Sequence, residues 1–127
     1  MNTTLKFTRS QICDFQNITT LMFQTRLEVI SFTDFYNIGN ILQRVQKMNF
    51  RSNFDTRTNY TFSLNPNEAR TFIELVSVCN ELLERTPYYT AFIMDICNTI
   101  HRQHLANQHN QNNFNLKATN EQKTIEQ

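Results

Sequence analysis

Two prolines, each directly after a helix-capping residue, constrain the fold of this chain more than any other feature of its sequence. Asn65-Pro66-Asn67-Glu68 combines a cap residue, a proline at the first helical position and a glutamate that can bond back to the cap. Thr86-Pro87 repeats the cap and the proline, and a proline cannot continue the helix before it. We therefore predict a helix from Pro66 to about Arg85 and another from Pro87 to about residue 104, joined as an αα-hairpin.

Apolar residues recur at three- and four-residue steps through most of the chain, which is the period of an amphipathic helix. In the first half they predict one helix after a Ser10 cap and a second that begins at Thr33 or Asp34 and ends near Asn49. Residues 50–58 have no such period, so we predict a loop there. The predicted core positions of the four helices are Ile12, Phe15, Ile18, Met22, Phe35, Ile38, Leu42, Val45, Met48, Ala69, Phe72, Ile73, Val76, Cys79, Leu83, Tyr89, Phe92, Ile93, Ile96 and Ile100.

Residues 4–8 and 60–64 alternate apolar and polar side chains, which is the period of a strand. The order of strand, helix and helix therefore occurs twice, over 4–49 and 60–104, as a duplication or two hairpins with the same packing would produce. We predict a mostly α domain over residues 1–105, with two αα-hairpins and two short strands that pair if the duplication is real. An α-rich α+β domain is the alternative. The Asn- and Gln-rich residues 106–127 are predicted to form a disordered tail.

The composition argues against several functional classes. A single glycine excludes loops that cradle phosphate, and twelve Lys+Arg against eleven Asp+Glu give a net charge of only +1. No apolar stretch has the length of a membrane span, and no signal-peptide pattern is present. The three cysteines are too widely spaced for a disulfide framework, and we expect each to be buried. These features predict a reduced, cytoplasmic protein without a membrane partner.

Cys97, His101 and His104 form the one arrangement typical of a metal site. Cysteine sulfur and histidine nitrogen are zinc ligands, and spacings of four and three place all three near one helical face. However, ligands on three successive turns span about 10 Å, which is too far for one ion without a bend. A pair such as Cys97 and His101 with a ligand from elsewhere is feasible. A core cysteine and two histidines at a helix end explain the pattern better. We expect no cofactor and keep a metal-dependent role as an alternative hypothesis.

Basic and aromatic side chains interleave around the predicted end of the second helix. They are Arg44, Lys47, Phe50, Arg51, Phe54 and Arg57. This mixture is typical of contact with single-stranded nucleic acid. The alternative is a helix end whose cations suit the helix dipole, followed by a loop whose phenylalanines pack onto the core. The near-neutral total charge favours that alternative, although exposed aromatics here would indicate a partner surface.

The predicted helix after Pro87 carries further apolar residues, including Tyr88 and Met94, outside its buried stripe. We expect this helix to be central in the core; otherwise its second face meets a partner or a second copy. No catalytic constellation is evident, so we do not expect an enzyme. The sequence favours a small non-enzymatic interaction or regulatory protein, of the kind that mobile elements encode, with a protein partner. A nucleic-acid-binding accessory protein that uses residues 44–57 is the main alternative.

Overall fold

The computed structural model describes residues 2–24, 31–78 and 87–104. The elements in these ranges are β1 (Thr3–Phe7), α1 (Arg9–Phe23), α2 (Phe32–Ser52), β2 (Tyr60–Leu64), α3 (Pro66–Val78) and a helix over residues 87–104. β1 and β2 pair antiparallel. The predicted mostly α fold with four helices and two short paired strands is therefore confirmed. The predicted Thr86 junction, the core positions Cys79 and Leu83, and the predicted tail lie outside the described residues.

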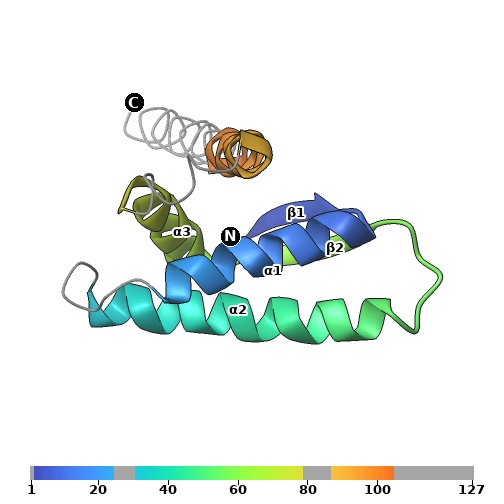
Figure 1. Ribbon diagram of the computed structural model, residues 1–127. Coiled ribbons are helices and arrows are strands. Elements are labelled where there is room, and N and C mark those ends of the chain that lie inside the picture. The colour runs from blue at the N-terminus through green and yellow to red at the C-terminus, as the bar shows by residue number, and fades with distance from the viewer. Residues whose placement is uncertain (1, 25–30, 79–86, 105–127) are drawn as a thin grey trace, which may run out of the picture.

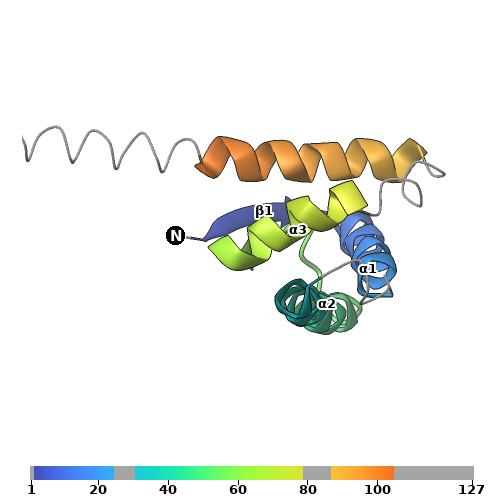
Figure 2. The same cartoon turned by 90° about the vertical axis from the view of Figure 1, so that its left-hand side faces the viewer.

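The elements form layers (Figures 1 and 2). α1 and α2 pack together on one side, β1, β2 and α3 lie in the middle, and the 87–104 helix covers the opposite side. Each layer contributes a phenylalanine to the centre. The Phe15 ring lies 5.0 Å from Phe7, 5.5 Å from Phe62 and 5.8 Å from Phe72. Phe7 in turn lies 5.8 Å from Phe92, so one aromatic cluster joins both halves of the chain.

Helix caps explain where the helices begin, and two of them differ from the prediction. α1 is capped by Thr8, not Ser10, because Thr8 and Gln11 form a reciprocal capping box. α2 is capped by Ser31, whose side chain accepts a hydrogen bond from the Asp34 amide, so the predicted Thr33 or Asp34 cap is wrong by two to three residues. The Asn65 cap of α3 is confirmed, since its side chain accepts from the Glu68 amide at 2.8 Å.

The predicted loop over 50–58 is wrong at its start, because α2 continues to Ser52. Phe50 therefore lies on the helix, and it is 67% exposed. Phe54, just beyond the helix, is 79% exposed. The prediction that both rings fold back onto the core is therefore wrong. The prediction that Cys13 is buried is also wrong. Cys13 is exposed because it lies beside the buried stripe of α1, and its thiol donates a hydrogen bond to the Asn49 side chain.

The 87–104 helix is peripheral, and the prediction that it is central in the core is wrong. Phe92, Ile93, Ile96 and Ile100 are buried on one side of it. The other side is exposed, with Tyr88 at 57% and Met94 at 55%. None of the described helices combines the length and the apolarity needed to cross a bilayer.

Neither edge of the two-stranded sheet pairs with another described strand. A long side chain covers one residue on each edge, and these two residues are opposite each other. Thr4 of β1 pairs with Ser63 of β2. On the β1 edge, the Gln103 amide accepts from the Thr4 N–H at 2.8 Å and donates to the Thr4 carbonyl at 2.9 Å. On the β2 edge, the Arg44 guanidinium donates to the Ser63 carbonyl at 2.7 Å. An uncovered edge strand is a template for further pairing, so these contacts limit where the sheet can be extended.

We predict that Gln103→Ala destabilises the protein by about 1–2 kcal/mol, because two backbone groups of β1 lose their partner. Urea unfolding measures the change. The matched control is Gln46→Ala, since Gln46 is exposed on α2 and should change stability by less than about 0.5 kcal/mol. Equal effects of the two substitutions would contradict the edge-covering role of Gln103.

Candidate binding groove between α2 and β2

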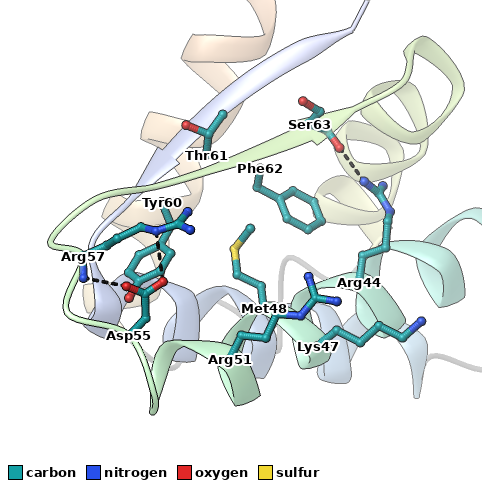
Figure 3. Close-up of a pocket in the computed structure, with 10 residues that line it drawn as sticks. All are labelled: Arg44, Lys47, Met48, Arg51, Asp55, Arg57, Tyr60, Thr61, Phe62 and Ser63. Carbon is teal, nitrogen blue, oxygen red and sulfur yellow. Dashed lines mark hydrogen bonds and ion pairs between the residues drawn. The ribbon is translucent and has the colours of Figure 1, made fainter.

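A groove of about 360 Å³ lies between α2 and the free edge of β2. Its lining residues, shown in Figure 3, are Arg44, Lys47, Met48, Arg51, Asp55, Arg57, Tyr60, Thr61, Phe62 and Ser63. Phe62 and Met48 point toward each other across its middle, while the Thr61 side chain points away from α2. The groove thus has an apolar floor, a helix on one side and strand backbone on the other. We call it the α2–β2 groove.

Arg44 closes one end of this groove and is a structural residue. Its guanidinium donates to the Ser63 carbonyl, pairs with Glu68 at 2.5 Å and lies 4.7 Å from the centre of the Phe62 ring. The Glu68 side chain is only 6% exposed, and it also accepts from the Asn65 amide. Arg44 therefore compensates a buried carboxylate that caps α3, and it is not a free cation as the sequence suggested.

Asp55 and Arg57 close the other end. The Arg57 side chain pairs with Asp55 at 3.0 Å, and its backbone amide donates to the same carboxylate at 2.9 Å. Arg9, at the start of α1, donates to the Asp55 carbonyl. The loop between α2 and β2 is thus held in place by its own ion pair and by α1.

Lys47 and Arg51 lie between these two ends with no carboxylate partner among the described residues. They are four residues apart on α2, so they share a face, and both are exposed. Like charges at this spacing destabilise a helix slightly, by a few tenths of a kcal/mol. An anion bound between them would remove that repulsion.

Phe50 and Phe54 form an apolar patch beside the same cations. Their ring centres are 5.4 Å apart at an angle of 60°. A second hollow of about 300 Å³ is lined by Phe50 and also by Lys47 and Arg51. The two cations therefore border both the α2–β2 groove and the hollow that contains Phe50.

The groove lining does not include the other candidate residues from the sequence, which are Tyr88, Met94, Cys97, His101 and His104. Within the described part of the chain, no group of three His, Cys, Asp or Glu side chains lies close enough to hold a metal ion, so Cys97, His101 and His104 do not converge. Burial raises the pKa of the Cys97 thiol, which opposes the thiolate that a metal ligand or nucleophile requires. Tyr88 donates to Asp14 at 2.9 Å, which raises the pKa of its hydroxyl, and both Tyr88 and Met94 are exposed.

The sequence prediction located the basic and aromatic segment but missed two features of the site. These are the strand edge at Thr61 and the contact of Arg9 with the loop. The alternation of residues 60–64 predicts a strand. No local pattern shows that this strand is an edge facing α2.

Comparisons with protein-family models, with curated proteins and with solved structures found no match to this chain.

We predict that Arg44→Ala lowers stability by roughly 2–3 kcal/mol, because it leaves the buried Glu68 carboxylate without its cation. Arg70→Ala is the control. Arg70 and Glu74 are 3.9 Å apart and 61% and 50% exposed, so their pair should contribute under about 0.5 kcal/mol. Denaturant unfolding of both variants gives the comparison, and a loss for Arg44→Ala no larger than the control would refute the structural role.

We predict that Tyr60→Phe leaves stability unchanged or raises it by up to about 1 kcal/mol. The Tyr60 hydroxyl is buried and has no hydrogen-bond partner among the described residues, so removing it relieves a desolvation cost. Thermal unfolding measures the effect. A clear loss of stability would show that the hydroxyl has a partner.

Proposed function

We propose that this chain is a non-enzymatic interaction protein that binds an acidic segment of a partner protein across the C-terminal half of α2. One observation carries the proposal. Lys47 and Arg51 are exposed on one helical face without a carboxylate among the described residues, between a groove and an exposed pair of phenylalanines. Aromatic and arginine side chains around an apolar centre are typical of protein interfaces.

The chemistry of the groove favours binding over catalysis. Its one carboxylate, Asp55, is paired with Arg57, and Arg44 is committed to Glu68. The groove lining holds no second carboxylate and no histidine or cysteine to act with Asp55, whereas general acid–base chemistry most often uses such groups. What remains available is positive charge, apolar surface and strand backbone.

A protein partner fits this surface better than a nucleic acid. The rings of Phe50 and Phe54 contact each other at 60°, so they form one patch and not two parallel platforms for successive bases. The net charge of +1 also gives little long-range attraction for a polyanion. A second copy fits less well, because a symmetric contact would bring Lys47 and Arg51 of both copies together.

We predict that Lys47→Glu/Arg51→Glu weakens binding of an acidic peptide at least tenfold, because attraction becomes repulsion. The probe is a fluorescein-labelled peptide of alternating glutamate and valine, measured by anisotropy at low salt, where exposed charges are least screened. The matched control is Lys6→Glu/Arg102→Glu, which makes the same charge change at exposed sites outside the groove and should bind normally.

A single-stranded deoxythymidine 20-mer is measured in parallel. If the 20-mer binds more tightly than the peptide, and if Lys47→Glu/Arg51→Glu abolishes this binding, the surface binds nucleic acid and the proposal is wrong. Equal losses in the two charge variants would also contradict it.

A further inference from the structure

We infer that the partner segment binds in extended form as a third strand on β2, paired with Thr61, with acidic residues on either side of the paired residue. This inference rests on the proposed function and specifies how the partner is held.

The hydrogen bonds at Thr4 determine which backbone groups of the sheet are free. In an antiparallel ladder, opposed residues alternate between pairs that bond to each other and pairs whose N–H and C=O point outward. The N–H and C=O of Thr4 both bond to the Gln103 side chain, and the carbonyl of the opposite residue, Ser63, accepts from Arg44. The backbone N–H and C=O groups of this pair therefore point away from the partner strand. Two residues along, Lys6 and Thr61 form the next pair of that type.

Thr61 therefore directs its N–H and C=O to the same edge as the Ser63 carbonyl, which is the edge that borders the α2–β2 groove. No hydrogen bond from another described element reaches either group. Arg44 covers the edge at Ser63, and the Asp55–Arg57 pair closes the other end. The edge is thus open at one residue, and a short extended peptide can pair there through two backbone hydrogen bonds.

The alternation of side chains then determines the partner's sequence pattern. Thr61 points away from α2, and its neighbours Tyr60 and Phe62 point to the inner side (Figure 3). A peptide residue paired with Thr61 also points away from α2, and the residues before and after it point toward α2. Those two residues face the side that carries Lys47 and Arg51.

The spacing of charges agrees with this placement. Four residues along a helix advance about 6 Å, which is the separation of Lys47 and Arg51 along α2. Alternate residues of a strand are about 6.7 Å apart. Two acidic residues separated by one residue therefore match the two cations, and the flexible lysine and arginine side chains absorb the difference. The recognised chemistry is an acidic–any–acidic segment in extended form.

The test uses the full chain and the peptide Thr-Val-Glu-Thr-Glu-Val-Thr, with blocked ends, followed by NMR at low salt. The peptide should slow hydrogen exchange of the Thr61 amide at least tenfold at saturation. The Lys6 amide is the matched control, since it occupies the equivalent outward position on the other edge and should not change. The isomer Thr-Val-Thr-Glu-Glu-Val-Thr places its glutamates on opposite faces and should bind several-fold more weakly.

N-methylation tests the backbone bonds directly. Methylating the central threonine amide removes the donor to the Thr61 carbonyl and should weaken binding about tenfold. Methylating either glutamate amide, which points outward, should have little effect.

The outcomes separate the two proposals. If the peptide binds and depends on Lys47 and Arg51, but Thr61 stays unprotected and all N-methyl peptides bind alike, the strand pairing is wrong and the proposed function stands. If no acidic peptide binds, or if Lys47→Glu/Arg51→Glu leaves binding unchanged, the proposed function and the strand pairing are both wrong. Tighter binding of the deoxythymidine 20-mer at the same residues also overturns both.

Discussion

The antiparallel pairing of β1 with β2 is the constraint on which the rest of this structure depends. A two-stranded sheet has no interior strand, so both strands present unpaired backbone groups. Gln103 and Arg44 supply partners to Thr4 and Ser63, which face each other across the sheet. These bonds attach the 87–104 helix and α2 to opposite edges. At the β2 edge, Arg44 covers Ser63, and Thr61 lines the groove two residues away.

Local signals predicted the elements of this fold well, and their ends less well. The Asn65 cap, the two alternating strands and the apolar stripes on the four helices depend on neighbouring residues, so the sequence displays them directly. The ends of α2 were misplaced because Ser31, Thr33 and Asp34 are all good caps, and because residues 50–52 tolerate a helix without requiring one. The register that opposes Thr4 to Ser63 has no local signal, since it depends on the packing of both strands on one core.

The candidate site shows the same division. The basic and aromatic segment was visible in the sequence, and so was a clue to the exposure of Phe50: at 100° per residue it lies about 140° round the helix from the buried Val45. The structural role of Arg44 was not visible, because Ser63 and Glu68 are 19 and 24 residues away along the chain. Of the four cations in this segment, Arg44 and Arg57 are paired with carboxylates, and Lys47 and Arg51 have no carboxylate partner among the described residues.

The bond between Gln103 and Thr4 spans 99 residues, and it imposes an order on how this molecule is made. The α1 and α2 pair can form from local contacts, whereas β1 must wait for β2, and its outer edge must wait for the 87–104 helix. Until that helix emerges during synthesis, Phe7 lacks Phe92 and the β1 edge is bare. The nascent chain therefore passes through a stage in which an apolar face and a strand edge are exposed together, and both features promote aggregation.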